Sequence, residues 1–265
     1  MREATLLDGT RVWCLRRSEA VVLDSHVDGY LDHGVEIDDG DTVIDVGANI
    51  GIFGVRAVQR HPGVRVFALE PVPDIFAVLE RNAADHGDGR LTPLRCGAAA
   101  APGRARFTYF PRSPALSTSE PEVWDDNEDE LAEAVAGATR TAPQWYARLV
   151  PAFAAPLLAK LMRGGAVEVD AELRTVSQII DEHGIDRVDL LKVDCEGAEL
   201  PTLEGVRAEH WPRVRRAVIE VHDRDGRLDR ITRILREAGL SRITTEQEAG
   251  FENTRMINVF AVRPD

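Results

Sequence analysis

Hydrophobic residues after position 40 form short continuous runs, and these runs alternate with stretches in which apolar residues recur at helical spacing. The continuous runs are TVIDVG, VRVFALEP, RLTPLRCGAAA, VDLLKVD, RRAVIEVH, SRITTEQ and MINVFAV. The stretches with helical spacing are IGIFGVRAVQRH, PDIFAVLERNAADHG, VSQIIDEHG, AELPTLEGV and DRITRILREAG. Short apolar runs separated by helices are typical of parallel strands with both faces covered. The pattern therefore predicts an α/β fold, a doubly wound and mostly parallel seven-stranded sheet with helices on both faces.

The first 36 residues have a different pattern. The segments TRVWCLRR and EAVVLDS, around Asp8-Gly9, predict the short strands of an N-terminal hairpin. A brief helix is expected near Val21 to His33. We expect a single domain, 1–265, that begins with this hairpin and helix in 1–36.

A long interruption separates the two halves of the alternating pattern, at residues 111–169. Its first part, SEPEVWDDNEDELAEAVAG, is acidic, and its second part, APQWYARLVPAFAAPLLAKLMRGG, is apolar. Pro143, Pro151 and Pro156 favour several short helices over one long helix. We expect a helical lid that lies over the ligand edge of the sheet, excludes water and lines an apolar pocket. A dimer contact or a mobile insertion is the alternative.

The sequence DVGANIG directly follows the first buried run, where a parallel sheet binds its ligand. Gly47 and Gly51 allow close backbone approach, and the helix that follows presents free N–H groups. Asn49 occupies the position of the second glycine in a dinucleotide fingerprint, which disfavours a nicotinamide cofactor. Glu70 ends the next strand, where a carboxylate can accept from both ribose hydroxyls. These features therefore favour a nucleoside-binding site, and the alternative is a plain strand-to-helix turn with Glu70 at the surface.

Composition and net charge limit the classes of partner and the cellular compartments that we expect for this protein. The net charge of −13 disfavours nucleic-acid binding, which needs an excess of Lys and Arg. Cys14, Cys96 and Cys195 have neither metal-ligand nor paired spacing, which indicates a reducing compartment. The chain has no long apolar run and no signal-peptide core at its start, so we expect no membrane partner and a cytoplasmic location.

Four motifs in this order carry a resemblance to a known family: DVGANIG, FALEPVPDIFAVLERN, DLLKVDCEGAEL and AVIEVHD. Together they resemble the FkbM family of S-adenosylmethionine-dependent methyltransferases, over roughly residues 20 to 246. The segment YFPRSPALS is similar to an element of family members that modify polyketides and related metabolites. The resemblance implies a class I, Rossmann-like methyltransferase fold and S-adenosylmethionine as cofactor. It also implies O-methylation of a secondary metabolite, such as a polyketide, a macrolide or a sugar-bearing compound.

The resemblance also implies which residues bind the cofactor. The loop residues lie around its methionine portion, Glu70 binds its ribose, and the pair after the third strand lines its adenine. The complete set is Tyr30, Asp45, Gly47, Asn49, Gly51, Glu70, Cys96, Gly97, Ser117 and Asp194.

An alcohol acceptor needs a base, because its hydroxyl is a poor nucleophile until it loses its proton. His222 directly follows the run AVIEV and has an ordinary pKa of about 6.5, so we expect it to be that base. Asp194 and Glu220 are expected to orient it. A structural role for His222, as a helix cap or loop contact, is the alternative. No metal is expected, but Asp194, Glu220 and His222 could together hold Mg²⁺.

The sequence leaves other interpretations open for two glutamates, for the reaction and for the partner. Glu196 and Glu199, in DCEGAEL, suit either a ligand contact or a strand-to-helix turn favoured by the helix dipole. Carboxyl or amine methylation and a non-catalytic cofactor-binding protein are alternatives to O-methylation. The expected partner is a free small-molecule acceptor, and a homodimer is left open.

Overall fold

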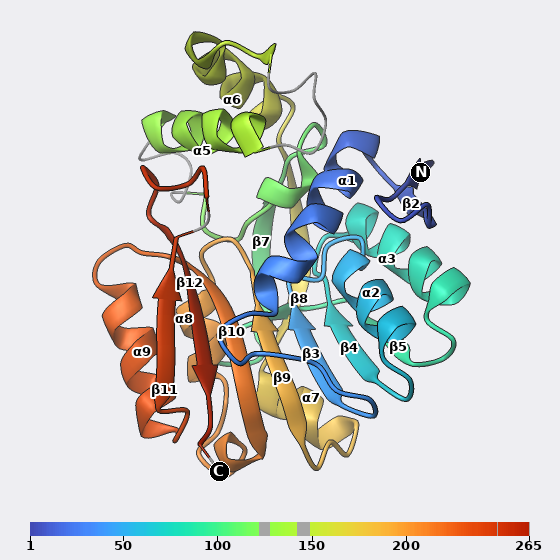
Figure 1. The fold of residues 1–265 in the computed structure, drawn as a ribbon, viewed down its shortest axis with the longest axis vertical. Helices are drawn as coiled ribbons and strands as arrows, with labels where there is room; N and C mark the ends of the chain where they lie inside the picture. The colour runs from blue at the N-terminus through green and yellow to red at the C-terminus, as the bar shows by residue number, and fades with distance from the viewer. Residues whose placement is uncertain (122–127, 142–148, 248, 265) are drawn as a thin grey trace.

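The fold is taken from a computed structural model, which describes residues 1–121, 128–141, 149–247 and 249–264. Its centre is a seven-stranded sheet in the order β11-β12-β10-β9-β3-β4-β5 (Figure 1). Only β12 runs antiparallel to its neighbours. The strands are β3 (Thr42–Val46), β4 (Arg65–Leu69), β5 (Leu91–Leu94), β9 (Val188–Val193), β10 (Val214–His222), β11 (Arg242–Glu246) and β12 (Met256–Val262). The predicted mostly parallel seven-stranded sheet is confirmed.

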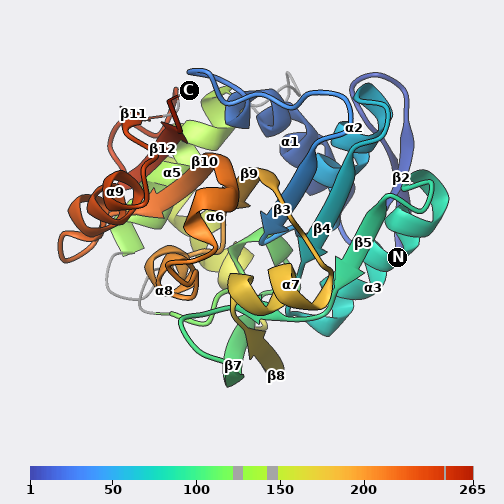
Figure 2. The same cartoon turned by 90° about the horizontal axis from the view of Figure 1, so that it is seen from below.

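Helices cover both faces of the sheet, as Figure 2 shows. Helices α1 (Arg17–His26), α2 (Ile52–Arg60) and α3 (Pro73–His86) contribute to one apolar cluster, and α7 (Val176–Glu182), α8 (Glu199–Glu204) and α9 (Arg227–Glu237) to the other. Neighbouring strand residues alternate between the clusters: Leu190 packs in the first and Leu191 in the second. Because both faces are buried, the central strands read as continuous apolar runs.

The N-terminal hairpin is present, but one of its predicted strands is wrong. It pairs β1 (Arg2–Thr5) with β2 (Arg11–Cys14), while the segment EAVVLDS belongs to helix α1. The buried positions of α1, Ala20 and Asp24, are four residues apart, which is helical spacing. Asp24 accepts from the buried guanidinium of Arg56 (Nε to Oδ1, 2.7 Å) and so fastens α1 to α2.

A second small sheet, which the sequence pattern did not predict, carries the insertion. It has the order β6-β8-β7, from β6 (Gly97–Ala98), β7 (Gly103–Tyr109) and β8 (Val167–Arg174). Most residues of β7 and β8 are not buried, so these strands lack the apolar runs of the main sheet. The chain leaves the core through β7 and returns through β8.

The insertion between β7 and β8 is helical in its described part. It contains the short η2 (Pro114–Leu116), α5 (Glu128–Thr141), the short η4 (Ala152–Ala154) and α6 (Ala155–Arg163). Pro151 directly precedes η4, and Pro156 lies in the first turn of α6, so prolines stand where the short helices begin. Pro143 lies outside the described residues. No described helix has the length and apolarity needed to cross a membrane.

Helices α5 and α6 build a small core of their own, and α5 docks on the β11–β12 connection. Their buried apolar residues are Leu131, Val135, Ala136, Ala155 and Ala159, together with Phe110. At the docking point a Cβ on Gly137 would lie 1.8 Å from the Gly250 carbonyl oxygen. The Arg255 N–H donates to Glu130 Oε1 at 2.8 Å. The insertion is therefore held at a defined place above the sheet.

Replacing Gly137 by Ala tests this docking. Alanine favours a helix over glycine by about 1 kcal/mol, but overpacking against a backbone carbonyl costs about 1–3 kcal/mol. We expect Gly137→Ala to loosen α5 and to make protease cleavage within residues 111–166 several-fold faster. Gly103→Ala, where the added Cβ meets nothing within 4 Å, is the control. Equal cleavage rates for the two variants would contradict the docking.

Candidate functional site

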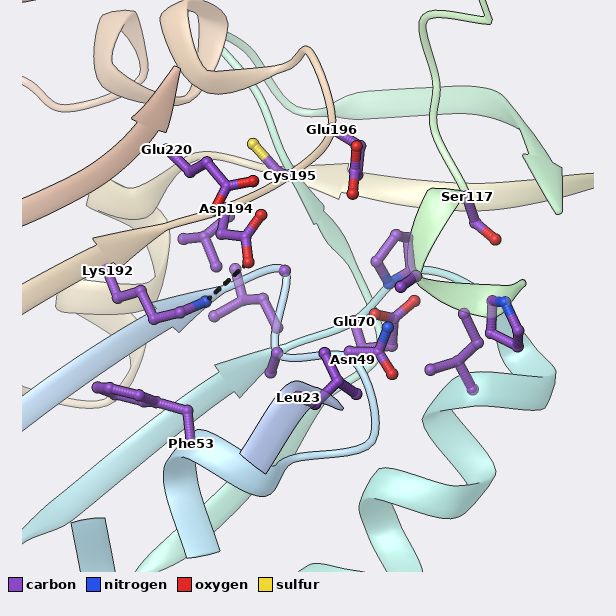
Figure 3. Close-up of a pocket in the computed structure, with 18 of the residues that line it drawn as sticks. Leu23, Asn49, Phe53, Glu70, Ser117, Lys192, Asp194, Cys195, Glu196 and Glu220 are labelled. Carbon is purple, nitrogen blue, oxygen red and sulfur yellow. Dashed lines mark ion pairs between the residues drawn. The ribbon is translucent and has the colours of Figure 1, made fainter. Parts of the chain in front are cut away.

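A cavity lies at the carboxyl ends of β3, β4, β9 and β10. The chain proceeds from β3 outward to β4 and β5, then returns to build β9 and β10 on the other side. Such a reversal of strand order opens a crevice at the strand ends. Figure 3 shows Asn49 and Glu70 on one side of this cavity, with Lys192, Asp194 and Glu220 on another.

The DVGANIG loop forms one wall through a turn that depends on glycine. Gly47 has φ 77°, and a Cβ there would lie 1.7 Å from the Asp194 carbonyl oxygen. Asn49 also has positive φ, 51°, and its Oδ1 accepts from the Ile50 N–H at 2.7 Å. Gly47 and Asn49 line the cavity, whereas Gly51 and Asp45 do not and support the loop from behind.

Glu70 presents a buried carboxylate to the same cavity. It is 5% exposed, and its Oε1 accepts from the Val72 N–H at 2.8 Å. Burial raises its pKa to about 8, although backbone hydrogen bonds from Val72 and Asn49 oppose the rise. Cys96 and Gly97 line the wall beyond it, and burial raises the pKa of the Cys96 thiol to about 11. Cys96 is therefore a neutral wall residue at pH 7 and not a nucleophile.

A buried group of charges stands on the opposite wall. Lys192 Nζ lies 3.0 Å from Asp45 Oδ1 and 3.5 Å from Asp194 Oδ2. Burial alone would lower the pKa of Lys192, but the two carboxylates raise it above its ordinary value. The Tyr30 hydroxyl donates to Asp194 Oδ2 at 2.8 Å, and the Lys192 ammonium lies 4.8 Å from the Tyr30 ring centroid and 5.6 Å from that of Phe53. Tyr30 and Asp194, both predicted from the sequence, are thus brought together in the cavity wall.

Lys192 is the site residue to which the sequence prediction assigned no role. Its signal was present, since it is the one basic residue within the buried run VDLLKVD. In the sheet it stands directly beside Asp45 of the neighbouring strand. A lysine in a strand buried on both faces needs a partner of opposite charge, and Asp45 of DVGANIG is that partner.

Ser117 and Glu220 also line the cavity, as does Glu196. Ser117 comes from the insertion, and its Oγ accepts from the Phe110 N–H at 3.3 Å. Glu220 is 8% exposed and lies near the end of β10. Of the insertion, only Pro114, Ala115 and Ser117 reach this cavity in the described part, and no described residue of α5 or α6 lines it. The expected lid helices do not form the wall of this pocket.

The structure does not support His222 as the base. Its side chain is buried and does not line the cavity. It lies between two carboxylates, with Nδ1 at 3.1 Å from Glu199 Oε1 and Nε2 at 3.3 Å from Glu196 Oε2. Burial alone would lower the pKa of His222, but the carboxylates raise it well above its ordinary value. A raised pKa favours the imidazolium, which has no lone pair with which to accept a proton from a substrate.

The alternative metal set is not assembled either. Within the described residues, Asp194, Glu220 and His222 do not bring their ligand atoms within 4.8 Å of one another. The single group of three that meets this criterion in that part of the chain is Asp32, His33 and Glu246, which is exposed and away from the cavity.

The two glutamates of DCEGAEL lie in different environments. Glu199 is fully buried, and its Oε1 accepts from the Gly197 N–H at 2.6 Å, as the structural interpretation of this turn requires. Glu196 has a positive φ of 52° and faces the cavity. The loop is also tied to the insertion, because Thr118 Oγ1 donates to the Glu196 carbonyl at 2.5 Å. Arg227 adds a second tie by donating to both Gly197 O and Glu120.

Replacing His222 by Gln tests the charge arrangement. Removing one partner of a buried ion pair costs about 3–5 kcal/mol, because the remaining charges stay desolvated. The folded pKa of His222 is raised, so its stabilisation is complete below about pH 6.5 and is lost as the pH rises through the folded value. The stability gap between the wild type and His222→Gln should therefore be largest near pH 6 and shrink in alkali.

The measurement is urea unfolding across this pH range. The control is His86→Gln, at the end of α3 and outside the cavity. A gap that widens with pH would mean that His222 is neutral in the folded protein.

Lys192→Met tests the buried charge group in the same way. The change leaves Asp45 without its cation at a position that is 0% exposed, and we expect a loss of about 3–5 kcal/mol in unfolding free energy. Adding Asp45→Asn should recover part of this loss, because the uncompensated carboxylate is then absent. Equal stability of the single and double variants in urea unfolding would refute the coupling.

Comparison with known proteins agrees with this geometry. A family model described as a methyltransferase FkbM domain matches residues 45–241. The chain is 37% identical over 235 residues to the 31-O-demethyl-FK506 methyltransferase FkbM of Streptomyces tacrolimicus, covering 88% of this chain and 85% of that protein. It is 35% identical over 206 residues to methyltransferase sdnD of Sordaria araneosa, covering 74% of this chain and 72% of that protein.

Among solved structures, methyltransferase FkbM from Methylobacillus flagellatus KT is similar with a TM-score of 0.52 and 19% sequence identity. The likeness covers 87% of this chain and 47% of that chain, so the present chain spans about half of the solved protein. At this identity the similarity concerns the fold.

Proposed function

Because this chain belongs to the FkbM family of methyltransferases, we propose that it transfers the methyl group of S-adenosylmethionine to a hydroxyl of a small secondary metabolite. The chain is a methyltransferase with the class I fold. The observation that carries the finer proposal is the cavity at the reversal of strand order. There Asn49 of the DVGANIG turn and the carboxylate of Glu70 lie across the cavity from Asp194.

The cavity residues fit this cofactor by their charge. Besides Glu70, three acidic side chains line the cavity, those of Asp194, Glu196 and Glu220, and the lysine among the described lining residues is Lys192. A lining with this excess of negative charge suits a ligand that carries a sulfonium and an ammonium. The raised pKa of Glu70 also fits, because two ribose hydroxyls that donate to its carboxylate would stabilise the charged form.

Each predicted cofactor residue then has a role in the proposal. Gly47 and Asn49 would contact the methionine portion through the loop backbone, and Glu70 would hold the ribose. Cys96 and Gly97 would line the adenine, with Tyr30 and Ser117 closing the cavity. Asp45 and Gly51 act indirectly, since they shape the loop without lining the cavity.

The bound cofactor supplies an activated methyl group, so the chain must orient the acceptor and remove its proton. Asp194 is the carboxylate we assign to the acceptor hydroxyl, because it lines the cavity and the Tyr30 hydroxyl fixes its orientation. Lys192 beside it stabilises the carboxylate, and Glu220 is the neighbouring acidic group in the same wall. His222 enters as a positioning residue that holds Glu196 and not as the base.

Two observations favour a hydroxyl acceptor. The relative from Streptomyces tacrolimicus acts on an O-demethyl compound, 31-O-demethyl-FK506. The carboxylates in the wall would also repel a carboxylate acceptor, which makes carboxyl methylation the weaker alternative. An amine acceptor remains compatible with the wall. A non-catalytic role is disfavoured, because the matching family model and both relatives are methyltransferases.

Calorimetric titration with S-adenosylhomocysteine is the first test. We expect binding in the micromolar range, about −8 kcal/mol, and the same affinity with EDTA as with added Mg²⁺. Failure to bind would overturn the cofactor assignment. A loss of affinity in EDTA would return a metal to the mechanism.

Glu70 variants test the ribose contact within the same titration. Glu70→Ala should weaken binding by about 1.5–3 kcal/mol for each charged hydrogen bond lost. Glu70→Gln, which keeps one carbonyl acceptor, should lose less. Glu204→Gln, on the exposed side of α8, is the matched control and should bind as the wild type does. An unchanged affinity in Glu70→Ala would remove Glu70 from the site.

A further inference from the structure

The cavity extends beyond Asp194 to a region that the proposed cofactor contacts do not reach. Starting from β4, the strand order along its edge is β4-β3-β9-β10-β12. Glu70 directly follows β4, whereas Met256 begins β12, which is four strands away. Neighbouring strands lie about 4.8 Å apart, so the two residues are separated by on the order of 20 Å. The end of the cavity at β12 is therefore left to the acceptor.

Two apolar side chains of the β11–β12 connection line this end of the cavity, those of Phe251 and Met256. Phe251 is 7% exposed. In the part of the chain that the structure describes, neither residue belongs to the two apolar clusters of the sheet or to the small core of α5 and α6. A buried phenylalanine outside these clusters presents its large apolar surface to the cavity that it lines. The pair is therefore explained by a ligand contact and not by core packing.

The connection holds these two residues through a buried hydroxyl. Thr254 Oγ1 donates to the Phe251 carbonyl at 2.8 Å and accepts from the Met256 N–H at 3.2 Å. The Thr254 N–H donates to the same Phe251 carbonyl at 2.9 Å. Thr254 is itself 7% exposed, so water does not compete freely for these bonds. Thr254 thus fixes the backbone on both sides of the turn.

Helix α5 supports the connection from the side away from the cavity. Gly250 directly precedes Phe251, and Gly250 is the residue against which Gly137 of α5 packs. Arg140 of α5 also donates from Nη2 to the Gly250 carbonyl at 3.4 Å. Figure 1 shows α5 beside this connection. The insertion therefore acts on the cavity indirectly, although no described residue of α5 lines it.

We propose that Phe251 and Met256 form the acceptor subsite and select an alcohol whose hydroxyl is attached to an apolar carbon body. The hydroxyl lies at Asp194, and the neighbouring carbons lie against the two side chains. Phenylalanine supplies a large rigid face, and methionine adapts to the shape of the ligand. A sugar ring would place hydroxyls against Phe251 and Met256, whose side chains offer them no strong hydrogen-bond partner. The inference rests on the proposed methyl transfer, because it takes the cofactor to occupy the β3–β4 side.

Methyl NMR tests the subsite at single residues, because the chain has three methionines, Met1, Met162 and Met256. Protein with carbon-13 in its methionine methyl groups is saturated with S-adenosylhomocysteine and titrated with cyclohexanol. The matched probe is inositol, which has the same carbon ring with a hydroxyl on every carbon. Met162→Leu and Met256→Leu variants assign the signals.

We expect cyclohexanol to shift the Met256 signal saturably and inositol to bind roughly tenfold more weakly, a difference of about 1.4 kcal/mol. The Met162 signal is the internal control and should not move, because Met162 packs on the small core of α5 and α6. A Met256 signal that stays in place, or that responds equally to both probes, would overturn the subsite.

Calorimetry with S-adenosylhomocysteine distinguishes this failure from failure of the proposed function. If S-adenosylhomocysteine does not bind, the proposed function and the subsite fall together. If it binds and cyclohexanol leaves the Met256 signal in place, the subsite alone falls.

Variants of the connection test its parts. Phe251→Ser should lower cyclohexanol affinity roughly tenfold, about 1.4 kcal/mol, and leave S-adenosylhomocysteine affinity unchanged. Phe251→Leu, which keeps an apolar side chain, should lose less. Thr254→Val removes the positioning hydroxyl at nearly constant volume and should also weaken cyclohexanol binding, whereas Thr254→Ser should restore it.

The Thr254 pair keeps the test open if Phe251→Ser fails to fold. Unchanged cyclohexanol affinity in the folded Phe251 and Thr254→Val variants would overturn the subsite. An equal loss of S-adenosylhomocysteine affinity would place these residues at the cofactor and would also overturn it. Equal effects of Thr254→Val and Thr254→Ser would remove Thr254 from the positioning role.

Discussion

The ion group of Lys192, Asp45 and Asp194 is the constraint on which the site depends. It joins the two central strands at the point where the strand order reverses, and it is buried where an unpaired charge is very unfavourable. Because Lys192 must meet Asp45, β3 and β9 have a fixed register, and Asp194 is carried to the cavity edge two residues later. The same register brings the Asp194 carbonyl against Gly47, which excludes any side chain from the turn. One buried lysine thus couples the sheet, the loop and the cavity wall.

A second charge group extends this order to the insertion. His222 holds Glu196 and Glu199, while Arg227 and Thr118 tie the same loop to residues of the insertion. Both groups pair buried carboxylates with a basic side chain whose pKa is raised, which favours the charged form of that side chain. The groups therefore keep the carboxylates of the cavity in place, and in the proposed reaction proton transfer is assigned to Asp194, which lines the cavity.

The sequence was informative where physical constraints are local. Continuous apolar runs identify strands buried on both faces, and a glycine turn after the first strand identifies the ligand edge, so the sheet and the loop were predictable. The surroundings of His222 were not, because His222 and Glu199 are 23 residues apart and only the fold shows that they meet. Strands β7 and β8 were not predicted, for a different reason. They are largely exposed and pair across the whole insertion, so they have no apolar run to mark them.

The insertion shows how far a whole-chain average departs from a local surface. A net charge of −13 suggests a molecule that repels every anion, yet the field of a surface charge is screened over about 8 Å in physiological salt. Within the insertion the charge is divided unevenly along the sequence: acidic residues are absent from 134 to 167, whereas the stretch 120–133 contains eight of them, and α5 carries part of that stretch beside α6. The described residues of α5 and α6 do not line the cavity at the strand ends, and the two helices have their own small core. The position of the insertion in the sequence suggested a lid, and its described helices pack on each other and on the β11–β12 connection without lining that cavity.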